Sequence, residues 1–345
     1  MRNKFNIEIP FYQAAKRKKT GILCRTAAAF VLGAALSGCT CSSMGNKKMS
    51  KVNFSEMWLE KNIAVREKIQ DVMQSYIDKT PKREFDDFDN DPQTATSNPV
   101  LQYYDQALER IANDIKATEV VPGKVVFWYL YNLGFVIKTP DVCFGVDIHH
   151  RHAEKLADFL DFAAITHNHD DHYNIPFMQK MTAQRKMVIS NFFPNQGYTK
   201  FPFYTHKIKN VTVHCYEADH SPSLKNFTMP LEIICPTGDK EFVFFTSGDC
   251  YDHKFLKKTS KRIDLYAVHP RCTMVPVEAA KVLDPEVTFI SHLQELGHEI
   301  NRFRWQFTVG REEVENFKKI NKKAYIPVWG EKFIWDGEKI TGCQE

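Results

Sequence analysis

The chain has 345 residues, of which 43% are hydrophobic and 26% are charged. This length holds one large domain or two modest ones, and the composition is ordinary for a soluble globular protein with a substantial core. The formal net charge is +4, but the first 38 residues carry seven basic side chains and one acidic one, so they account for +6 and the remainder is near −2. A slightly acidic body argues against nucleic-acid binding, which needs an excess of basic side chains.

The N-terminal segment has the three parts of an export signal. A basic stretch from Lys16 to Arg25 precedes the apolar run 27–36, and Leu36-Ser37-Gly38-Cys39 follows. An apolar run of this length is too short to cross a bilayer, so residues 1–38 are expected to be a signal peptide. The ending resembles the lipobox of bacterial lipoproteins, which implies that Cys39 is acylated and becomes the mature N-terminus. The chain would then be a membrane-anchored lipoprotein of a bacterial cell envelope, facing the periplasm. The alternative is an ordinary secretory leader with an incidental cysteine.

Residues 39–52 are expected to form a lipidated tether, and residues 53–120 an N-terminal helical segment. Apolar residues recur at helical spacing in two stretches of this segment, which predicts two amphipathic helices. The acidic run from Glu84 to Pro92 lacks the glycine and the terminal glutamate of an EF-hand loop, so we interpret it as a solvated linker. The two apolar stripes consist of Val65, Ile69, Val72, Met73 and Tyr76, and of Leu101, Tyr104, Leu108, Ile111 and Ile115.

From Lys124 on, the pattern changes to short β-branched and aromatic segments separated by turn residues. The first three expected strands are consecutive, and the later ones alternate with helices. This order favours an α+β domain over residues 121–345, with two β-sheets between layers of helices, over a doubly wound sheet. The expected strands are 125–130, 134–138, 142–147, 163–166, 187–190, 211–216, 231–235, 242–247, 265–268 and 287–291, with a helix over 154–162.

Three histidines and two aspartates stand within the six residues His167-Asn168-His169-Asp170-Asp171-His172. So many polar side chains would pack badly in a core, whereas a loop at the end of strand 163–166 can turn alternate side chains toward a common point. The first two histidines can share one cation, while Asp171 and His172 can reach a second. Mixed imidazole and carboxylate ligands suit Zn²⁺, and equally Mn²⁺ or Fe. The alternative is a histidine-rich surface loop without a metal.

The H-x-H-x-D-H pattern resembles the signature of the metallo-β-lactamase-fold hydrolases, and the likeness extends from about Lys124 to Trp335. It implies a four-layer αββα sandwich with a metal centre, in which Asp249 matches a carboxylate that bridges two metals. Asp147 stands where the family has a supporting aspartate, which would fix the tautomer of a ligand histidine. The metal ligands that the resemblance implies are His167, His169, Asp171, His172, His220, Asp249 and His292.

Some of these positions have competitors in the sequence. His214 is the alternative to His220, while His298 and His269 are alternatives to His292. Cys250 adjoins the matched aspartate and could be taken for a metal thiolate. Neighbours on an extended strand point to opposite sides, so we interpret this cysteine as a packing residue.

Within the family, the chain most resembles the ascorbate-6-phosphate lactonase-like branch. The resemblance rests on Asp264-Leu265-Tyr266, His269-Pro270, Thr273-Met274, Glu278-Ala279-Ala280 and Phe289-Ile290-Ser291-His292. Lipid phosphodiesterases of the phospholipase D type share this layout, so the branch does not define the substrate. The segment Leu293-Gln294-Glu295 departs from both groups, which have Trp/Tyr-Gly-Thr there.

The resemblance implies two divalent cations, Zn²⁺ or Mn²⁺, or a single one. Adjacent cations would let a bridging water lose a proton near neutral pH, and the hydroxide would attack a carbonyl or phosphorus centre. Asp171 lies between two ligand histidines, and we expect it to act catalytically by orienting this water or accepting its proton. The candidates for substrate contact are expected near strand ends and are His149, His150, His269, His298 and Arg304.

Three functions follow from these observations. The first is a metal-dependent hydrolase that acts on a lactone, an ester or a phosphodiester. The second is a phospholipase D-type lipid phosphodiesterase, which the expected lipid anchor and the N-terminal helical segment favour. The third is a non-catalytic metal-binding lipoprotein, which fits poorly with a complete ligand set. The expected partners are a small-molecule or lipid substrate and a membrane, reached through the N-terminal lipid, and no nucleic acid.

Overall fold

A computed structural model of the chain describes residues 53–200, 203–300 and 302–342, which belong to one compact unit. The expected signal peptide and Cys39 lie outside these residues, so both stay predictions. In the described part of the chain, no helix combines the length and the apolar character that a membrane span requires.

The first of two seven-stranded β-sheets takes strands from both ends of the described chain. β1 is the centre of its antiparallel part and pairs with β2 on one side and with β13 on the other. In spatial order the strands are β14 (Ile340–Thr341), β13 (Glu331–Trp335), β1 (Val125–Tyr129), β2 (Phe135–Lys138), β3 (Cys143–Val146), β4 (Phe162–Ala164) and β5 (Met187–Ile189).

The second sheet is formed by the middle of the chain and one later strand. Its strands run antiparallel from β6 to β9 and parallel from β9 to β12. In spatial order they are β12 (Lys323–Tyr325), β11 (Pro285–Ile290), β10 (Ile263–Val268), β9 (Glu241–Thr246), β8 (Leu231–Pro236), β7 (Val211–Tyr216) and β6 (Phe203–Ile208).

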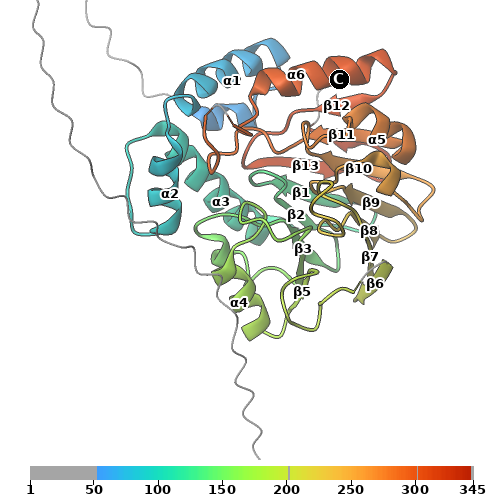
Figure 1. The fold of residues 1–345 in the computed structure, drawn as a ribbon. Helices are drawn as coiled ribbons and strands as arrows, with labels where there is room; N and C mark the ends of the chain where they lie inside the picture. Colours follow the sequence, from blue (N-terminus) through green and yellow to red (C-terminus); the bar gives the residue numbers. More distant parts are fainter. Residues whose placement is uncertain (1–52, 201–202, 301, 343–345) are drawn as a thin grey trace, which may run out of the picture. The chain divides into compact units, whose positions relative to one another are not determined.

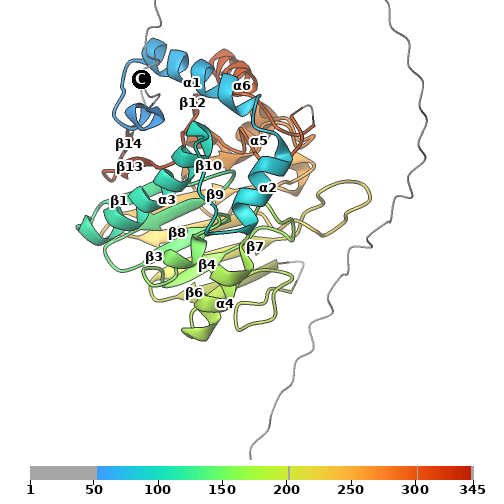
Figure 2. The ribbon, with the colours of Figure 1, turned by 90° about the vertical axis from the view of Figure 1, so that its left-hand side faces the viewer.

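The two sheets share an aromatic core, and helices cover their outer faces. Phe127 of β1 stacks on Phe242 of β9, with ring centroids 5.9 Å apart. In the outer layers, α4 packs against β5 and α6 against β11 and β12, while Figure 2 shows α3 and α4 in front of the first sheet. The helices are α1 (Ile63–Ile77), α2 (Lys82–Asn90), α3 (Pro99–Ala117), α4 (Ile175–Ala183), α5 (Pro276–Leu283) and α6 (Phe307–Lys319), with short 3₁₀ turns at Phe54–Trp58, Ala153–Lys155 and His253–Phe255 (Figure 1). The predicted α+β sandwich of four layers is confirmed.

The parallel strands bring their carboxyl ends to one edge of each sheet. In the first sheet β3, β4 and β5 run parallel, and in the second sheet β9, β10, β11 and β12 do. Residues that follow such strands therefore gather at the same end of the sandwich, where α/β folds commonly place their sites.

Two local predictions were wrong. The acidic run 84–92 is not a linker, because α2 occupies most of it and buries Phe85 and Phe88, which stand one helical turn apart and outweigh the polar residues around them. The helix expected over 154–162 is only the 3₁₀ turn Ala153–Lys155, because the buried strand β4 already begins at Phe162.

The N-terminal helical segment is fixed to the C-terminal strands by a buried ion pair. Nη2 of Arg66, on α1, lies 2.5 Å from Oε2 of Glu331, at the start of β13, and both residues are only 4% exposed. The same guanidinium donates to the carbonyls of Met57 and Ile326. The segment is thus an integral part of the fold, held by charge as well as by apolar packing.

Candidate metal centre

The candidate ligands follow the carboxyl ends of strands from both sheets. His167 comes three residues after β4, Asp249 three residues after β9, and His292 two residues after β11. Gly248 permits the turn before Asp249, since its φ is +51° and a Cβ there would lie 2.8 Å from the Cβ of Thr166. The absence of a side chain at Gly248 thus lets the loop that carries Asp249 approach Thr166, the neighbour of His167.

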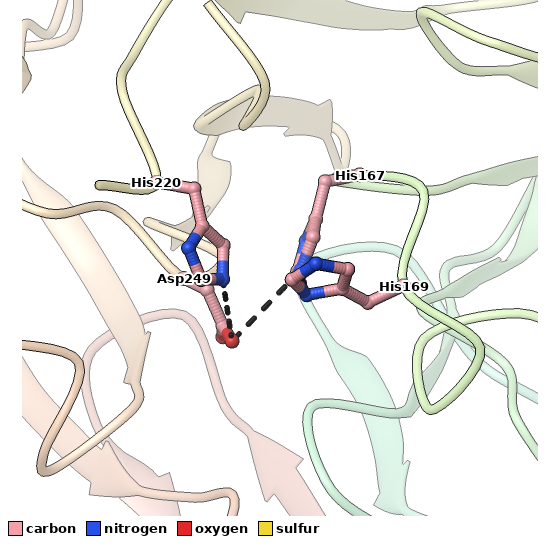
Figure 3. Close-up of side chains that lie close together, drawn as sticks. All are labelled: His167, His169, His220 and Asp249. Carbon is pink, nitrogen blue, oxygen red and sulfur yellow. Dashed lines mark hydrogen bonds and ion pairs between the residues drawn. The ribbon is translucent and has the colours of Figure 1, made fainter. Parts of the chain in front are cut away.

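The first group of ligands is His167, His169, His220 and Asp249, whose candidate ligand atoms all lie within 4.8 Å of one another. Nε2 of His167 is 3.1 Å from Nδ1 of His169 and 3.8 Å from Oδ2 of Asp249. Nε2 of His220 is 3.6 Å from the same oxygen. Figure 3 shows the histidines on both sides of a common point, with the carboxylate of Asp249 directed into it.

The second group is Asp171, His172 and His292. Nε2 of His292 lies 3.0 Å from Oδ2 of Asp171 and 3.3 Å from Nε2 of His172. Oδ1 of Asp249 is 3.6 Å from Nε2 of His172, whereas its Oδ2 faces the first group. Asp249 therefore lies between the two groups, with one oxygen toward each.

Several buried atoms of this centre have no hydrogen-bond partner among the described residues: both ring nitrogens of His220, Oδ1 of Asp249 and Nδ1 of His292. An unpaired polar atom in a protein interior is costly, and such atoms are rare in folded proteins. Imidazole nitrogens and carboxylate oxygens are the usual ligands of Zn²⁺ and also suit Mn²⁺ and Fe. The residues thus fit one or two divalent cations.

Asp147 lies behind the second group and is fully buried. Its carboxylate accepts hydrogen bonds from the backbone N–H and Oγ1 of Thr166, at 2.7 and 2.8 Å. It also lies 3.0 Å from Nδ1 of His172, so this nitrogen donates and leaves the lone pair of Nε2 for a cation. This is the supporting position that the family resemblance implies, and it is reached through a left-handed backbone at Asp147, with φ of 44°.

The buried groups of the centre shift one another's pKa in both directions. Burial opposes a charge on His172, but the carboxylates of Asp171, Asp249 and Asp147 raise its pKa well above the usual range, so a cation would take the place of a proton on this ring. Burial lowers the pKa of His167 well below its usual range, with the neighbouring His172 adding to the effect. Burial opposes ionisation of Asp249 and Asp171, but the surrounding histidines hold the pKa of both carboxyls well below the usual range. Neutral imidazole and ionised carboxylate are the forms that bind metals.

The competitors of the ligand residues lie apart from these two groups, except for His269. His214, on β7, contacts Thr205 through Nδ1 at 2.9 Å, so the structure brings His220 and not His214 to the centre. Sγ of Cys250 donates to the carbonyl of Asp252 at 3.3 Å in a buried position. The ring of His269 lies against that of His292, with ring centroids 4.2 Å apart and the planes tilted by 46°.

The histidines at 149, 150 and 298, the next candidates for substrate contact, form contacts with other residues of the chain. Nδ1 of His149 lies 3.1 Å from the carbonyl of Tyr173, and His298 contacts the buried Glu295. His150 is buried and stacks on Tyr104, with ring centroids 4.0 Å apart. His150 is therefore a core residue and does not have the contact with substrate that the sequence suggested.

Arg304 also has a different role from the one expected. It is 4% exposed, and its guanidinium nitrogens donate to the carbonyls of Ile77, Thr80, Leu296 and His298. A guanidinium has five N–H donors, and all five are used in these bonds. Arg304 thus ties α1 to the segment after β11 instead of contacting substrate.

Two residues near the metal centre were not predicted from the sequence. The buried Asn132 donates through Nδ2 to the carbonyl of Asp171 at 3.2 Å, and its own carbonyl accepts the N–H of His292 at 2.8 Å. It thereby joins two ligand loops from a left-handed position, a conformation that favours asparagine. Phe227 lies against the rings of His167, His169 and His220 and forms an apolar wall.

No protein-family model matches the chain, and no curated protein matches it. Among solved structures, it is similar to Igni18, a metallo hydrolase from the archaeon Ignicoccus hospitalis, with 16% identity, a TM-score of 0.47 and coverage of 61% of this chain and 98% of that one. The metallo-β-lactamase-fold protein YhfI from Bacillus subtilis has 14% identity, a TM-score of 0.42 and coverage of 61% and 98%. CmlA, a diiron β-hydroxylase from Streptomyces venezuelae, has 12% identity, a TM-score of 0.44 and coverage of 63% and 54%, so the match spans about half of its length.

Proposed function

We propose that the chain is a hydrolase of the metallo-β-lactamase superfamily that uses one or two divalent cations, Zn²⁺ or Mn²⁺. One observation carries this proposal: seven candidate ligands from both sheets converge in two groups, with Asp249 between them. Four buried nitrogen and oxygen atoms of these ligands also lack a hydrogen-bond partner among the described residues.

The cations would lower the pKa of a water and stabilise the negative charge that develops on an attacked carbonyl or phosphorus centre. His167, His169, His220 and Asp249 would hold one, and Asp171, His172 and His292 the other. The substrate class is then a lactone, an ester or a phosphodiester, all of which are cleaved by addition of water to such a centre.

Among the residues of the chain, Asp171 is the candidate to orient the attacking water and to take up its proton. Oδ2 of Asp171 lies 3.0 Å from Nε2 of His292, and the residue is 9% exposed. Asp147 would keep His172 in the tautomer that binds a cation, through the contact with Nδ1.

A lipid phosphodiester is the second candidate substrate. The loop after His220 presents Leu224, which is 37% exposed, and continues to Phe227 beside the ligand histidines. Apolar side chains next to the centre would suit an acyl chain, and acylation at Cys39 would hold the enzyme at the membrane where such a substrate resides.

The test combines metal analysis with a substrate panel. The purified chain is expected to carry one or two equivalents of Zn²⁺ or Mn²⁺ and to hydrolyse at least one of a lactone, a carboxylic ester and a chromogenic phosphodiester. His169→Ala should reduce turnover to background, whereas His214→Ala, a histidine outside the centre, should not change it. A metal content near zero that added Zn²⁺ or Mn²⁺ does not raise would contradict the proposal, and bound metal without turnover would favour the non-catalytic alternative.

The panel also separates the two substrate classes. Turnover of the phosphodiester and of a phospholipid in vesicles, without turnover of the lactone, would favour the lipid phosphodiesterase. In that case Leu224→Ser should weaken turnover of the vesicle substrate more than that of the soluble phosphodiester, because only the former has an acyl chain to contact.

A further inference from the structure

His269 lies at the junction of the two ligand groups without belonging to either. It directly follows β10, is 6% exposed and contacts the ring of His292. One of its ring nitrogens lies within 4.8 Å of ligand atoms of both Asp249 and His292. By distance alone, these three residues could form a further cation site.

The hydrogen bonding of His269 excludes that role. Its Nδ1 is 3.0 Å from the backbone nitrogen of Arg271, which can only donate, so Nδ1 accepts through its lone pair. The single proton of the imidazole is then on Nε2. Neither nitrogen has a free lone pair for a cation, and Nε2 can only donate a hydrogen bond.

The loop that carries His269 is fixed from two directions. Arg271 forms ion pairs with Glu312 and Glu313 on α6, the former at 2.9 Å between Nη2 and Oε2. Sγ of Cys272 donates to the carbonyl of Asp249 at 3.1 Å. The N–H of Arg271 is therefore held in the place where it sets the tautomer of His269, and the imidazole is held beside the ligand groups.

We infer that His269 is a substrate-binding residue that donates a hydrogen bond from Nε2 to a negatively charged oxygen at the metal centre, and that it is not a cation ligand. The ligand is an oxyanion, either a phosphate oxygen or the oxygen that becomes negative when a carbonyl is attacked. This inference rests on the proposed function and deepens it. A preorganised donor placed where negative charge develops contributes about 10²- to 10³-fold to the rate in hydrolases that have such a donor.

Three measurements on the full chain test the donor. Nitrogen-15 NMR of the histidine rings should show the proton of His269 on Nε2, both without cation and with Zn²⁺ bound. Calorimetric titration with inorganic phosphate should show binding to the Zn²⁺-loaded chain that is weakened roughly 10- to 100-fold in His269→Ala. His269→Gln, whose amide can donate near the position of Nε2, should regain most of this affinity. Zn²⁺ stoichiometry and affinity should be the same in all three proteins.

The opposite results would overturn the inference. A loss of one Zn²⁺ equivalent, or Zn²⁺ affinity reduced tenfold or more in His269→Ala, would make His269 a ligand. So would a proton on Nδ1 together with a cation-induced shift of Nε2. Equal phosphate affinity in wild type and His269→Ala would show that Nε2 contacts no oxyanion.

The failures of the two proposals are distinguishable. A wild-type chain that binds no cation contradicts the proposed function, and the NMR measurement on the same sample still decides the tautomer. A wild-type chain that binds cation and hydrolyses substrate, while His269→Ala matches it in phosphate affinity and rate, contradicts the present inference alone.

Discussion

The Arg66–Glu331 ion pair and the metal centre are both buried and charged, and they differ in how many of their polar atoms have a hydrogen-bond partner. At the Arg66–Glu331 pair, the carboxylate accepts from Arg66, from the hydroxyl of Tyr325 and from the N–H of Val328. At the metal centre, Asp249 and His220 keep buried atoms without a hydrogen-bond partner among the described residues. The ion pair satisfies its charges within the fold, whereas the metal centre leaves polar atoms available to a ligand.

Breaking the ion pair should have the largest effect on stability. Arg66→Ala leaves the charge of Glu331 buried without its cation, so we expect the free energy of unfolding to fall by about 3 to 5 kcal/mol. Urea denaturation measures this loss. Replacing both residues, as in Arg66→Met with Glu331→Leu, should restore most of the stability, because no charge is then left unpaired.

The Zn²⁺ affinity of a folded Arg66→Ala chain should match that of wild type, since the pair lies outside the centre. A tenfold loss of Zn²⁺ affinity in this variant would show that the ion pair and the metal centre are coupled and would contradict the contrast between them.

The next effect concerns the residue behind the metal centre. Asp147→Asn should weaken Zn²⁺ binding or turnover roughly 10- to 100-fold, because the amide accepts less strongly from Nδ1 of His172 and orients the ring less well. Titration calorimetry with Zn²⁺ measures the affinity. Asp170→Asn is the matched control, since this exposed aspartate stands in the same segment and contributes to neither ligand group. Equal losses in both variants would contradict a specific role for Asp147.

A smaller effect is expected at His150, which is buried outside the metal centre and contacts the backbone carbonyl of Tyr104. Burial lowers the pKa of His150 well below the usual histidine value of about 6.5, so the unfolded chain binds a proton at mildly acidic pH that the folded chain does not bind. The stability from this group is therefore complete above about pH 6.5 and is lost as pH falls below that value, by about 1.4 kcal/mol per pH unit.

This pH dependence is measured by urea denaturation of wild type and of His150→Gln between pH 7 and pH 5. The variant should lose less stability over this range than wild type. An identical pH dependence in the two proteins would show that His150 does not titrate as its burial requires.

Part of the metal centre could be predicted from the sequence, because several of its residues stand close together in the chain. His167, His169, Asp171 and His172 stand within six residues, so a local pattern carries their chemistry. Asp249 and His292 each follow an apolar strand, and they were proposed as ligands because their order matches that of the family the chain resembles, with His298 and His269 as alternatives to His292. Placement of these residues in two groups agrees with the expectation, while metal binding itself stays a prediction.

Contacts between residues that are distant in the sequence could not be predicted from local sequence patterns. Asn132 looks like an ordinary turn residue, and its bonds to ligand loops arise only when β1 and β11 are brought together. Arg304 stands near the ligand histidines in the sequence, but its five donors bind carbonyls of the fold. The edge strands β12 and β14 are too short to give a periodic signal.

The central claim is that the unpaired atoms around Asp249 are completed by divalent cations. Zn²⁺ titration of the metal-free chain, followed by calorimetry and checked by elemental analysis, tests it most directly in wild type and in Asp249→Ala. We predict one or two equivalents in wild type and at least one fewer in the variant, because Asp249 offers an oxygen to each group. The absence of binding in wild type, or the same stoichiometry and affinity in Asp249→Ala, would contradict the account.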